Sequence, residues 1–230
     1  LPFIFDDSGN IVDNSTIRDL GNFLHVSGNR YIGFLSFALN YHLGGLNVFG
    51  YHLVNLLIHI TNGFLVYCLV LLLLRAVQIP SSSMAVSPWV AFFAALLFVA
   101  HPIQTQAVTY IVQRFASLVT LFYLLSVVCY LKGRLADNSP HPPLSLRGGE
   151  GGVTRRYFWY GAALLSSLLA MKTKENSFTL PFMILLVEGA FFRPLTWRRW
   201  LTLIPFLLML PLIPFSRGDI LGEAERFASD

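Results

Sequence analysis

Two adjacent carboxylates near the start of the chain are the residues best suited to proton transfer. Asp6 and Asp7 stand between Phe5 and Ser8. Neighbouring carboxylates repel one another, and such pairs serve as general bases or as metal ligands. A solvated acidic turn is the alternative, because Asp7-Ser8-Gly9-Asn10 has the composition of a turn. We take Asp6 and Asp7 as the candidate catalytic residues.

A polar stripe runs along the first long apolar segment. It contains His52, Asn55, His59 and Asn62, whose spacings of three and four residues put them on one face of a helix. Such a face is costly in lipid, so we expect it to face the interior of a bundle or a wet cavity. His59 and Asn62 are expected to hydrogen-bond between helices. His52 lies nearest the outer surface and is a candidate substrate contact.

A third polar group surrounds a proline. His101, Gln104 and Gln106 lie beside Pro102, and Arg114 follows on the next predicted helix. Backbone freed by a helix break is tolerated at membrane depth only where it is buried in protein or lines a cavity. An Arg beside amide donors suits a phosphate, since a guanidinium binds phosphate oxygens in pairs. A metal is weakly supported here, because one histidine is the only good ligand.

Further charges stand at a later helix junction. Lys172, Lys174 and Glu175 separate two apolar segments. They could be interfacial side chains that extend toward water, or they could supply charge to a polar site. Glu188 near the opposite surface is predicted to be structural. Glycine-rich nucleotide loops, zinc-protease motifs and hydrolase elbows are not found, so ATP-driven transport and the common hydrolases gain no support.

The composition places these residues in a membrane protein. The chain has 230 residues, of which 55% are hydrophobic and 12% charged, with a mean hydropathy of +0.61. Soluble domains carry about 25% charged residues. The net charge of +4 comes from cations between apolar runs, which indicates topology and not nucleic-acid binding. Cys68 and Cys129 lie inside apolar runs, which excludes a disulfide framework.

The apolar runs predict an all-α polytopic bundle of about six membrane helices, given a requirement of about 20 residues per span. The runs are residues 51–74, 84–103, 108–131, 157–171, 178–192 and 200–215. More of the cations fall on the side of Arg75 than on the side of Arg30, which indicates that the Arg75 side is cytoplasmic.

The same pattern divides the chain into three parts. Residues 1–50 are predicted to form the first extracytoplasmic loop, with an interfacial helix at 31–43. Residues 51–216 form the transmembrane domain, in which the Pro- and Gly-rich stretch 136–154 is expected to be a flexible cytoplasmic linker. Residues 217–230 would begin a further extracytoplasmic segment. We expect the sequence to be a fragment, because it opens on Leu1.

Three blocks of the sequence carry a family resemblance. They are RYIGFLSFALNYHLGGLNVFGYHLVNLLIHITN at 30–62, HPIQTQAVTYIVQRFASL at 101–118 and AMKTKENSFTLPF at 170–182. Together they resemble the membrane half of bacterial tetratricopeptide-repeat membrane proteins. That family is similar to the transmembrane and tetratricopeptide-repeat O-mannosyltransferases and, through them, to the GT-C glycosyltransferase fold. Gln106 departs from the Glu that the animal relatives carry in their His-Pro-x-x-Thr-Glu motif.

The resemblance implies a glycosyltransferase that moves a sugar, mannose in the related enzymes, from a polyprenyl-phosphate carrier to a protein Ser or Thr hydroxyl on the extracytoplasmic face. GT-C enzymes use an acidic residue of the first extracytoplasmic loop, which corresponds to Asp6 or Asp7 here. The residues expected to contact the substrate or the carrier phosphate are Arg114, Lys172, Lys174, His101, Gln104, Gln106, His52 and Arg30.

The expected partners are the polyprenyl-phosphate-linked sugar, a protein acceptor and membrane lipid, without nucleic acid. No cofactor and no metal ligand is assigned, and a requirement for a divalent cation stays open. The expected location is the bacterial inner membrane. Two other functions are consistent with the pattern: a non-catalytic membrane anchor for a tetratricopeptide-repeat domain, and a transporter of a lipid-linked sugar. An anchor would not need outward carboxylates together with Arg114 and Lys174 at membrane level.

Overall fold

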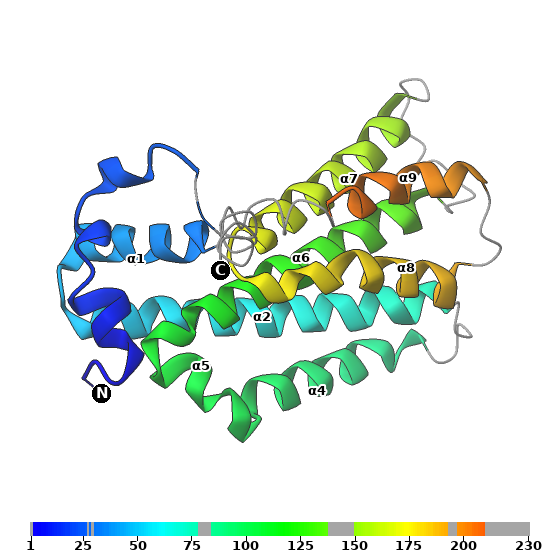
Figure 1. Ribbon diagram of the computed structural model, residues 1–230. Coiled ribbons are helices and arrows are strands. Elements are labelled where there is room, and N and C mark those ends of the chain that lie inside the picture. Colours follow the sequence, from blue (N-terminus) through cyan, green and yellow to red (C-terminus); the bar gives the residue numbers. More distant parts are fainter. Residues whose placement is uncertain are drawn as a thin grey trace, which may run out of the picture.

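The described part of the chain is built from helices (Figure 1). The computed structural model describes residues 2–26, 28, 30–77, 84–137, 150–192 and 197–209. The long helices are α1 (Tyr31–Gly44), α2 (Val48–Ala76), α4 (Ser87–Ala100), α6 (Arg114–Asp137), α7 (Glu150–Met171), α8 (Leu180–Phe191) and α9 (Trp197–Leu207). Shorter helical segments are η1 (Ser8–Val12), η2 (Ser15–Arg18), η3 (Leu20–Phe23), η4 (Pro102–Gln104), α5 (Thr105–Thr109), η5 (Ile111–Gln113) and η6 (Glu175–Thr179). The predicted all-α class is confirmed.

Helices α2 and α6 lie side by side and run in the same direction. Arg114, the first residue of α6, donates a hydrogen bond to Asn55 near the start of α2. Leu72 near the end of α2 and Leu131 near the end of α6 belong to one apolar cluster. Helix α4 runs back along the side of α2 that faces away from α6, and α7 runs antiparallel to α6 (Figure 1). The bundle therefore has two ends. We call the end with α1 and the starts of α2 and α6 the α1 end, and the opposite one the Arg134 end.

The six apolar runs correspond to helices of different length. Helix α2 and residues 111–136 are long and apolar enough to cross a membrane. Helix α4 and the segment Pro102–Thr109 pass the same test together but are bent by 53°, which confirms the predicted break at Pro102. Helices α8 and α9 have 12 and 11 residues. By length and composition the described residues thus contain two or three candidate spans, fewer than the six predicted.

The helix bounds can be set beside the predicted division of the chain. Helix α1 occupies the range expected for the interfacial helix, one residue longer. Helix α6 continues to Asp137 and α7 begins at Glu150, so the two helices overlap the ends of the range expected for the linker, 136–154. The rest of that linker, the end of the sixth run and residues 217–230 lie outside the described residues.

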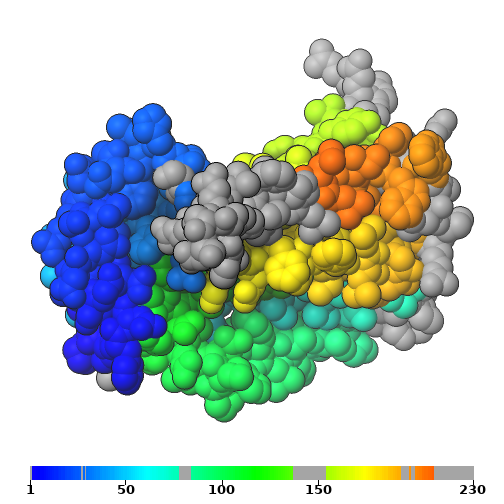
Figure 2. Space-filling model, in the orientation of Figure 1, coloured from blue at the N-terminus to red at the C-terminus, as the bar shows by residue number. Residues whose placement is uncertain are grey.

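The segment before α2 is packed onto the bundle. Ile11 and Ile17 are buried against Phe37 of α1 and Tyr51 of α2, in a cluster that also contains Phe115 of α6. Gly33 of α1 meets the Phe115 ring so closely that a Cβ would collide with it. The space-filling view shows the N-terminal segment and α1 together at one end of the molecule (Figure 2). Burial of these apolar side chains holds α1 against α2 and α6.

The polar stripe of α2 faces the neighbouring helices, as predicted. Ring nitrogens of His52 and His59 lie 3.1 Å from the carbonyl oxygens of Val108 and Val99. The Asn62 side chain donates to the Ser117 carbonyl at 2.9 Å. These contacts link α2 to α4, α5 and α6 inside the bundle, where protein groups take the place of water as partners. Asn62 Oδ1 is buried without a hydrogen-bond partner among the described residues.

A buried ion pair joins α6 to α8 at the Arg134 end. Arg134 Nε lies 2.9 Å from Glu188 Oε2, with side chains 2% and 1% exposed. The Tyr130 hydroxyl donates to the same carboxylate oxygen at 2.9 Å, and the guanidinium lies over the Phe192 ring. The prediction that Glu188 is structural is consistent with these contacts.

We expect Glu188→Ala to destabilise the protein by about 3 to 5 kcal/mol, because it leaves the buried Arg134 without its carboxylate. Equilibrium unfolding in detergent measures the effect. The control is Glu175→Ala at the α1 end, whose side chain is 31% exposed and should change the unfolding free energy little. Equal effects of the two substitutions would contradict a special role of the buried pair.

Candidate functional site

The structure gives the two candidate catalytic carboxylates different environments. The Asp7 side chain is 1% exposed, and its two oxygens accept hydrogen bonds from the backbone N–H groups of Val112 (2.8 Å) and Ile4 (3.1 Å). Asp6 is exposed, and its backbone N–H donates to the Tyr110 hydroxyl at 3.3 Å. Asp7 therefore fixes the N-terminal segment to the start of α6, while Asp6 presents its carboxylate to the surface.

Tyr110 is the neighbour of this acidic pair. Its ring lies edge-on to Phe5, whose φ of 47° is left-handed. Desolvation raises the pKa of the Tyr110 phenol, and the charges of Asp6 and Asp7 raise it further. A phenol is protonated at neutral pH even at its ordinary pKa of about 10, and the upward shift leaves it a hydrogen-bond donor beside Asp6.

Arg114 is enclosed by protein. Its side chain is 0% exposed and donates to Asn55 Oδ1 (2.7 Å), Asn40 Oδ1 (3.0 Å) and the carbonyl oxygens of Tyr51 (2.9 Å) and Ser36 (3.3 Å). The guanidinium also lies over the rings of Phe37 and Tyr51. These contacts tie α1 and α2 to the start of α6. The contact of Arg114 with a carrier phosphate stays a prediction.

A second group of predicted residues lies at the junction of α7 and α8. Lys172 and Lys174 are half-buried there, and the Lys172 carbonyl accepts a hydrogen bond from the Ile32 N–H of α1 at 3.0 Å. Arg30 lies 3.7 Å from Glu175 through Nε and Oε1, and its guanidinium stands over the Phe115 ring. Segments about 140 residues apart in sequence thus bring three cations to the α1 end.

The remaining predicted residues gather near the bend between α4 and α5. His101 is exposed, and its Nδ1 accepts the Ile103 N–H at 3.2 Å, which caps η4. Gln104 is half-buried and Gln106 exposed on the same segment, and His52 contacts Val108 just beyond it. In the view of Figure 1 this bend and α1 lie on opposite sides of α2. The predicted residues thus form separate groups at the α1 end of the bundle.

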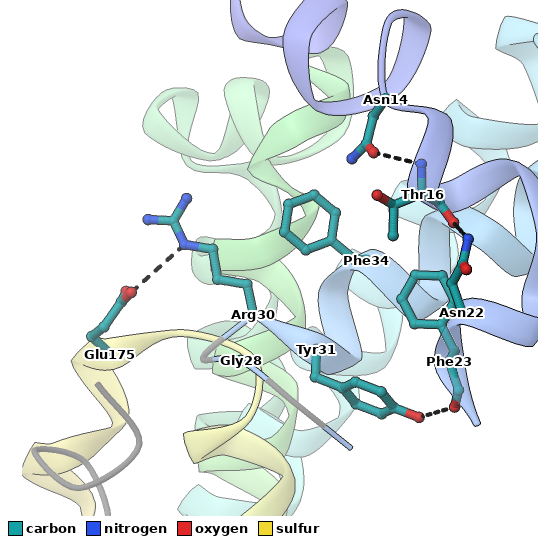
Figure 3. Close-up of a pocket in the computed structure, with 9 residues that line it drawn as sticks. All are labelled: Asn14, Thr16, Asn22, Phe23, Gly28, Arg30, Tyr31, Phe34 and Glu175. Carbon is teal, nitrogen blue, oxygen red and sulfur yellow. Dashed lines mark hydrogen bonds and ion pairs between the residues drawn. The ribbon is translucent and has the colours of Figure 1, made fainter. Parts of the chain in front are cut away.

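A hollow of 460 Å³ opens beside the cations (Figure 3). It lies between the segment of η2 and η3, the start of α1, and η6. Arg30 is the one predicted site residue that lines it. Glu175, which the sequence predicts only as a charge at the helix junction, lines it as well. Asn14, Thr16 and Asn22 are polar lining residues outside the predicted site. The repeated asparagines of residues 10–22 were the available signal.

Metal-ligand geometry is not evident in the part of the chain that the structure describes. No three His, Cys, Asp or Glu side chains gather there as the ligands of a metal ion would.

Fold and site together define a polytopic α-helical membrane protein with a polar site at one end of the bundle. The chain is 31% identical over 196 residues to human Protein O-mannosyl-transferase TMTC4, and 33% over 209 residues to Drosophila melanogaster Protein O-mannosyl-transferase Tmtc3, each match covering 77% of this chain. It is 34% identical over 148 residues, 56% of the chain, to human Protein O-mannosyl-transferase TMTC2. The chain is thus a homologue of the TMTC O-mannosyl-transferases.

The matches cover a limited part of these relatives. The chain spans 25% of TMTC4, 21% of Tmtc3 and 16% of TMTC2. Comparison with protein-family models gave no match, and neither did comparison with solved structures.

Proposed function

We propose that this protein is a membrane glycosyltransferase. It transfers a sugar, which we take to be mannose, from a polyprenyl-phosphate carrier to a Ser or Thr hydroxyl of a protein at the extracytoplasmic face. The observation that carries the proposal is the similarity to proteins named O-mannosyl-transferases over 77% of the chain. The exposed Asp6 and the cations at the same end of the bundle support it.

Asp6 is the general base in this proposal. Its carboxylate takes the proton of the acceptor hydroxyl as the hydroxyl oxygen attacks C1 of the sugar. The bond between C1 and the phosphate oxygen breaks, its electron pair stays on that oxygen, and polyprenyl phosphate leaves. Asp7 is a positioning residue, because both of its oxygens are engaged by backbone N–H groups. Of the two carboxylates, Asp6 is the one that an acceptor can reach.

The leaving phosphate gains negative charge, which nearby cations stabilise. Lys172 and Lys174, half-buried at the junction of α7 and α8, supply this charge in our proposal, while Arg30 beside them pairs with Glu175 and contacts the sugar. Arg114 contributes in this proposal by holding α1 in place, because its guanidinium has no exposed surface. The contacts of His52, His101, Gln104 and Gln106 with the carrier remain proposals, and they would lie on the α4–α5 side of the site.

The length and apolar composition of the helices support a location in a membrane. Two or three helices can span a bilayer by length and composition. That the α1 end faces away from the cytoplasm is our proposal, and it rests on the distribution of cations in the sequence. The relatives named above are animal proteins, so the bacterial inner membrane stays a prediction.

The donor requirement tests this function. Purified protein in mixed detergent and lipid micelles is given a Ser- and Thr-containing peptide together with either polyprenyl-phosphate mannose or a nucleotide-linked mannose. We expect mannosylated peptide, detected by mass spectrometry, only with the polyprenyl-linked donor. Transfer from the nucleotide donor alone would contradict the proposed carrier. Folded protein that is inactive with both donors would favour a membrane anchor.

A further inference from the structure

The hollow at the α1 end has the size of a small-molecule site and is open to one side. Its volume of 460 Å³ lies within the range of about 300 to 1,000 Å³ of ligand pockets. Figure 3 shows the Phe34 ring between Arg30 on one side and Thr16 on the other. We call this hollow the Arg30–Glu175 pocket.

Its walls are held by hydrogen bonds within the protein. Asn14 accepts the Thr16 N–H at 2.9 Å, and the Asn22 side chain donates to the Thr16 carbonyl at 3.0 Å. The Tyr31 hydroxyl donates to the Phe23 carbonyl at 2.6 Å and fixes η3 to the start of α1. The pocket is therefore formed before any ligand arrives, which lowers the entropy lost on binding.

Several polar atoms of the lining stay available. Among the described residues, the hydrogen bonds of the wall leave the two Nη groups of Arg30, the Thr16 hydroxyl and Asn22 Oδ1 without protein partners. Glu175 uses one carboxylate oxygen toward Arg30. The lining thus offers both hydrogen-bond donors and acceptors, and the opposite charges of Arg30 and Glu175 compensate each other.

This arrangement selects among ligand classes. A phosphate would gain from Arg30 but would be repelled by the Glu175 carboxylate beside it. A neutral polyhydroxylated ring fits better, because each hydroxyl both donates and accepts, and its C–H face can lie on the negative face of an aromatic ring. An acceptor peptide would use the same hydrogen bonds but has no flat C–H face to match Phe34.

We propose that the Arg30–Glu175 pocket binds one sugar unit, with its hydroxyls held by Arg30, Glu175, Thr16 and Asn22 and its ring on Phe34. That the sugar is the hexose of the donor rests on the proposed function. The binding of a neutral sugar as such rests on the geometry of the pocket.

Binding of methyl α-mannopyranoside to the purified protein in detergent tests this site. Titration by saturation-transfer NMR gives the dissociation constant for wild type, Glu175→Gln and Thr16→Val. We expect Glu175→Gln to raise it about tenfold or more, the loss expected for a hydrogen bond to a charged group. Thr16→Val should raise it about fivefold, the loss expected for a neutral hydrogen bond. The matched control is Asp13→Asn, an exposed carboxylate of the same segment outside the pocket lining, which should bind like wild type.

Two other probes, inorganic phosphate and an acceptor peptide, test whether the pocket binds an anion or a peptide instead of a sugar. Inorganic phosphate that displaces the mannoside would show an anion site and overturn the proposal. A Ser- and Thr-containing peptide that loses binding in Glu175→Gln and Thr16→Val, while the mannoside does not, would show an acceptor site and overturn it as well. Unchanged melting temperatures of both variants exclude loss of fold as the cause.

The outcomes separate this inference from the proposed function. Mannoside binding that depends on Glu175 and Thr16 supports the pocket even if no sugar is transferred. Transfer by wild type together with mannoside affinities unchanged in both variants would remove the pocket and leave the glycosyltransferase in place.

Discussion

Asp6→Asn is expected to lower the rate of sugar transfer by about 10²- to 10⁴-fold, the usual worth of a general base. The carboxamide keeps the size of the side chain but accepts no proton at neutral pH. Because Asp6 is exposed, the melting temperature should stay near that of wild type. The measurements are the initial rate with polyprenyl-phosphate mannose and thermal unfolding in the same micelles.

Asp7→Asn is the matched control, since it makes the same change one residue along. Both oxygens of Asp7 accept backbone hydrogen bonds, and an amide can keep only one of them. We therefore expect a lower melting temperature, with activity that recovers toward wild type when the assay is cooled. Wild-type turnover of Asp6→Asn would exclude Asp6 as the base. A rate loss confined to Asp7→Asn at every temperature would move that role to Asp7.

Arg114→Ala is expected to cost about 4 kcal/mol or more of unfolding free energy, because several hydrogen bonds from a buried cation are lost at once. Arg114→Lys should restore little, since an ammonium cannot reach Asn40, Asn55 and the Tyr51 carbonyl as a planar fork does. Equilibrium unfolding in detergent measures both. The control is Arg75→Ala near the end of α2, an exposed cation that should change stability little.

The same variant decides how Arg114 acts. If Arg114→Ala folds normally and loses only affinity for the polyprenyl-phosphate donor, Arg114 contacts the carrier phosphate as the sequence suggested. Loss of folded protein together with loss of contact between α1 and α6 supports the positioning role.

The periodicity of polar and apolar residues, together with the composition, predicted much of the architecture. The spacing of His52, Asn55, His59 and Asn62 identified the inward face of α2, because helical periodicity is a local property of the sequence. Pro102 marked the bend for the same reason, since a proline disturbs the helix wherever the fold places it.

The partners of individual side chains could not be predicted in this way. Glu188 pairs with Arg134, 54 residues away, because α6 and α8 pack side by side. Asp6 and Asp7 look alike in sequence, and they differ because η5 presents the Val112 N–H, and the N-terminal segment the Ile4 N–H, to Asp7. These outcomes depend on which helices meet and in what register, which local patterns do not encode.

The candidate site shows the same limit. Arg114 was selected as an ionisable group at membrane depth, but its burial depends on amide groups of α1 and α2 that become neighbours only in the folded chain. The Arg30–Glu175 pocket combines residues of the N-terminal segment with Glu175. No motif or spacing links positions so far apart.

The central claim is transfer to a protein hydroxyl on the membrane face that carries Asp6, and sidedness tests it most directly. Protein reconstituted in sealed vesicles containing polyprenyl-phosphate mannose receives the acceptor peptide only outside or only inside. An Asp13→Cys variant, labelled with a membrane-impermeant maleimide, reports which side the N-terminal segment faces. We predict mannosylated peptide only when the peptide is on the side of that segment. Product formed only on the opposite side would contradict the account.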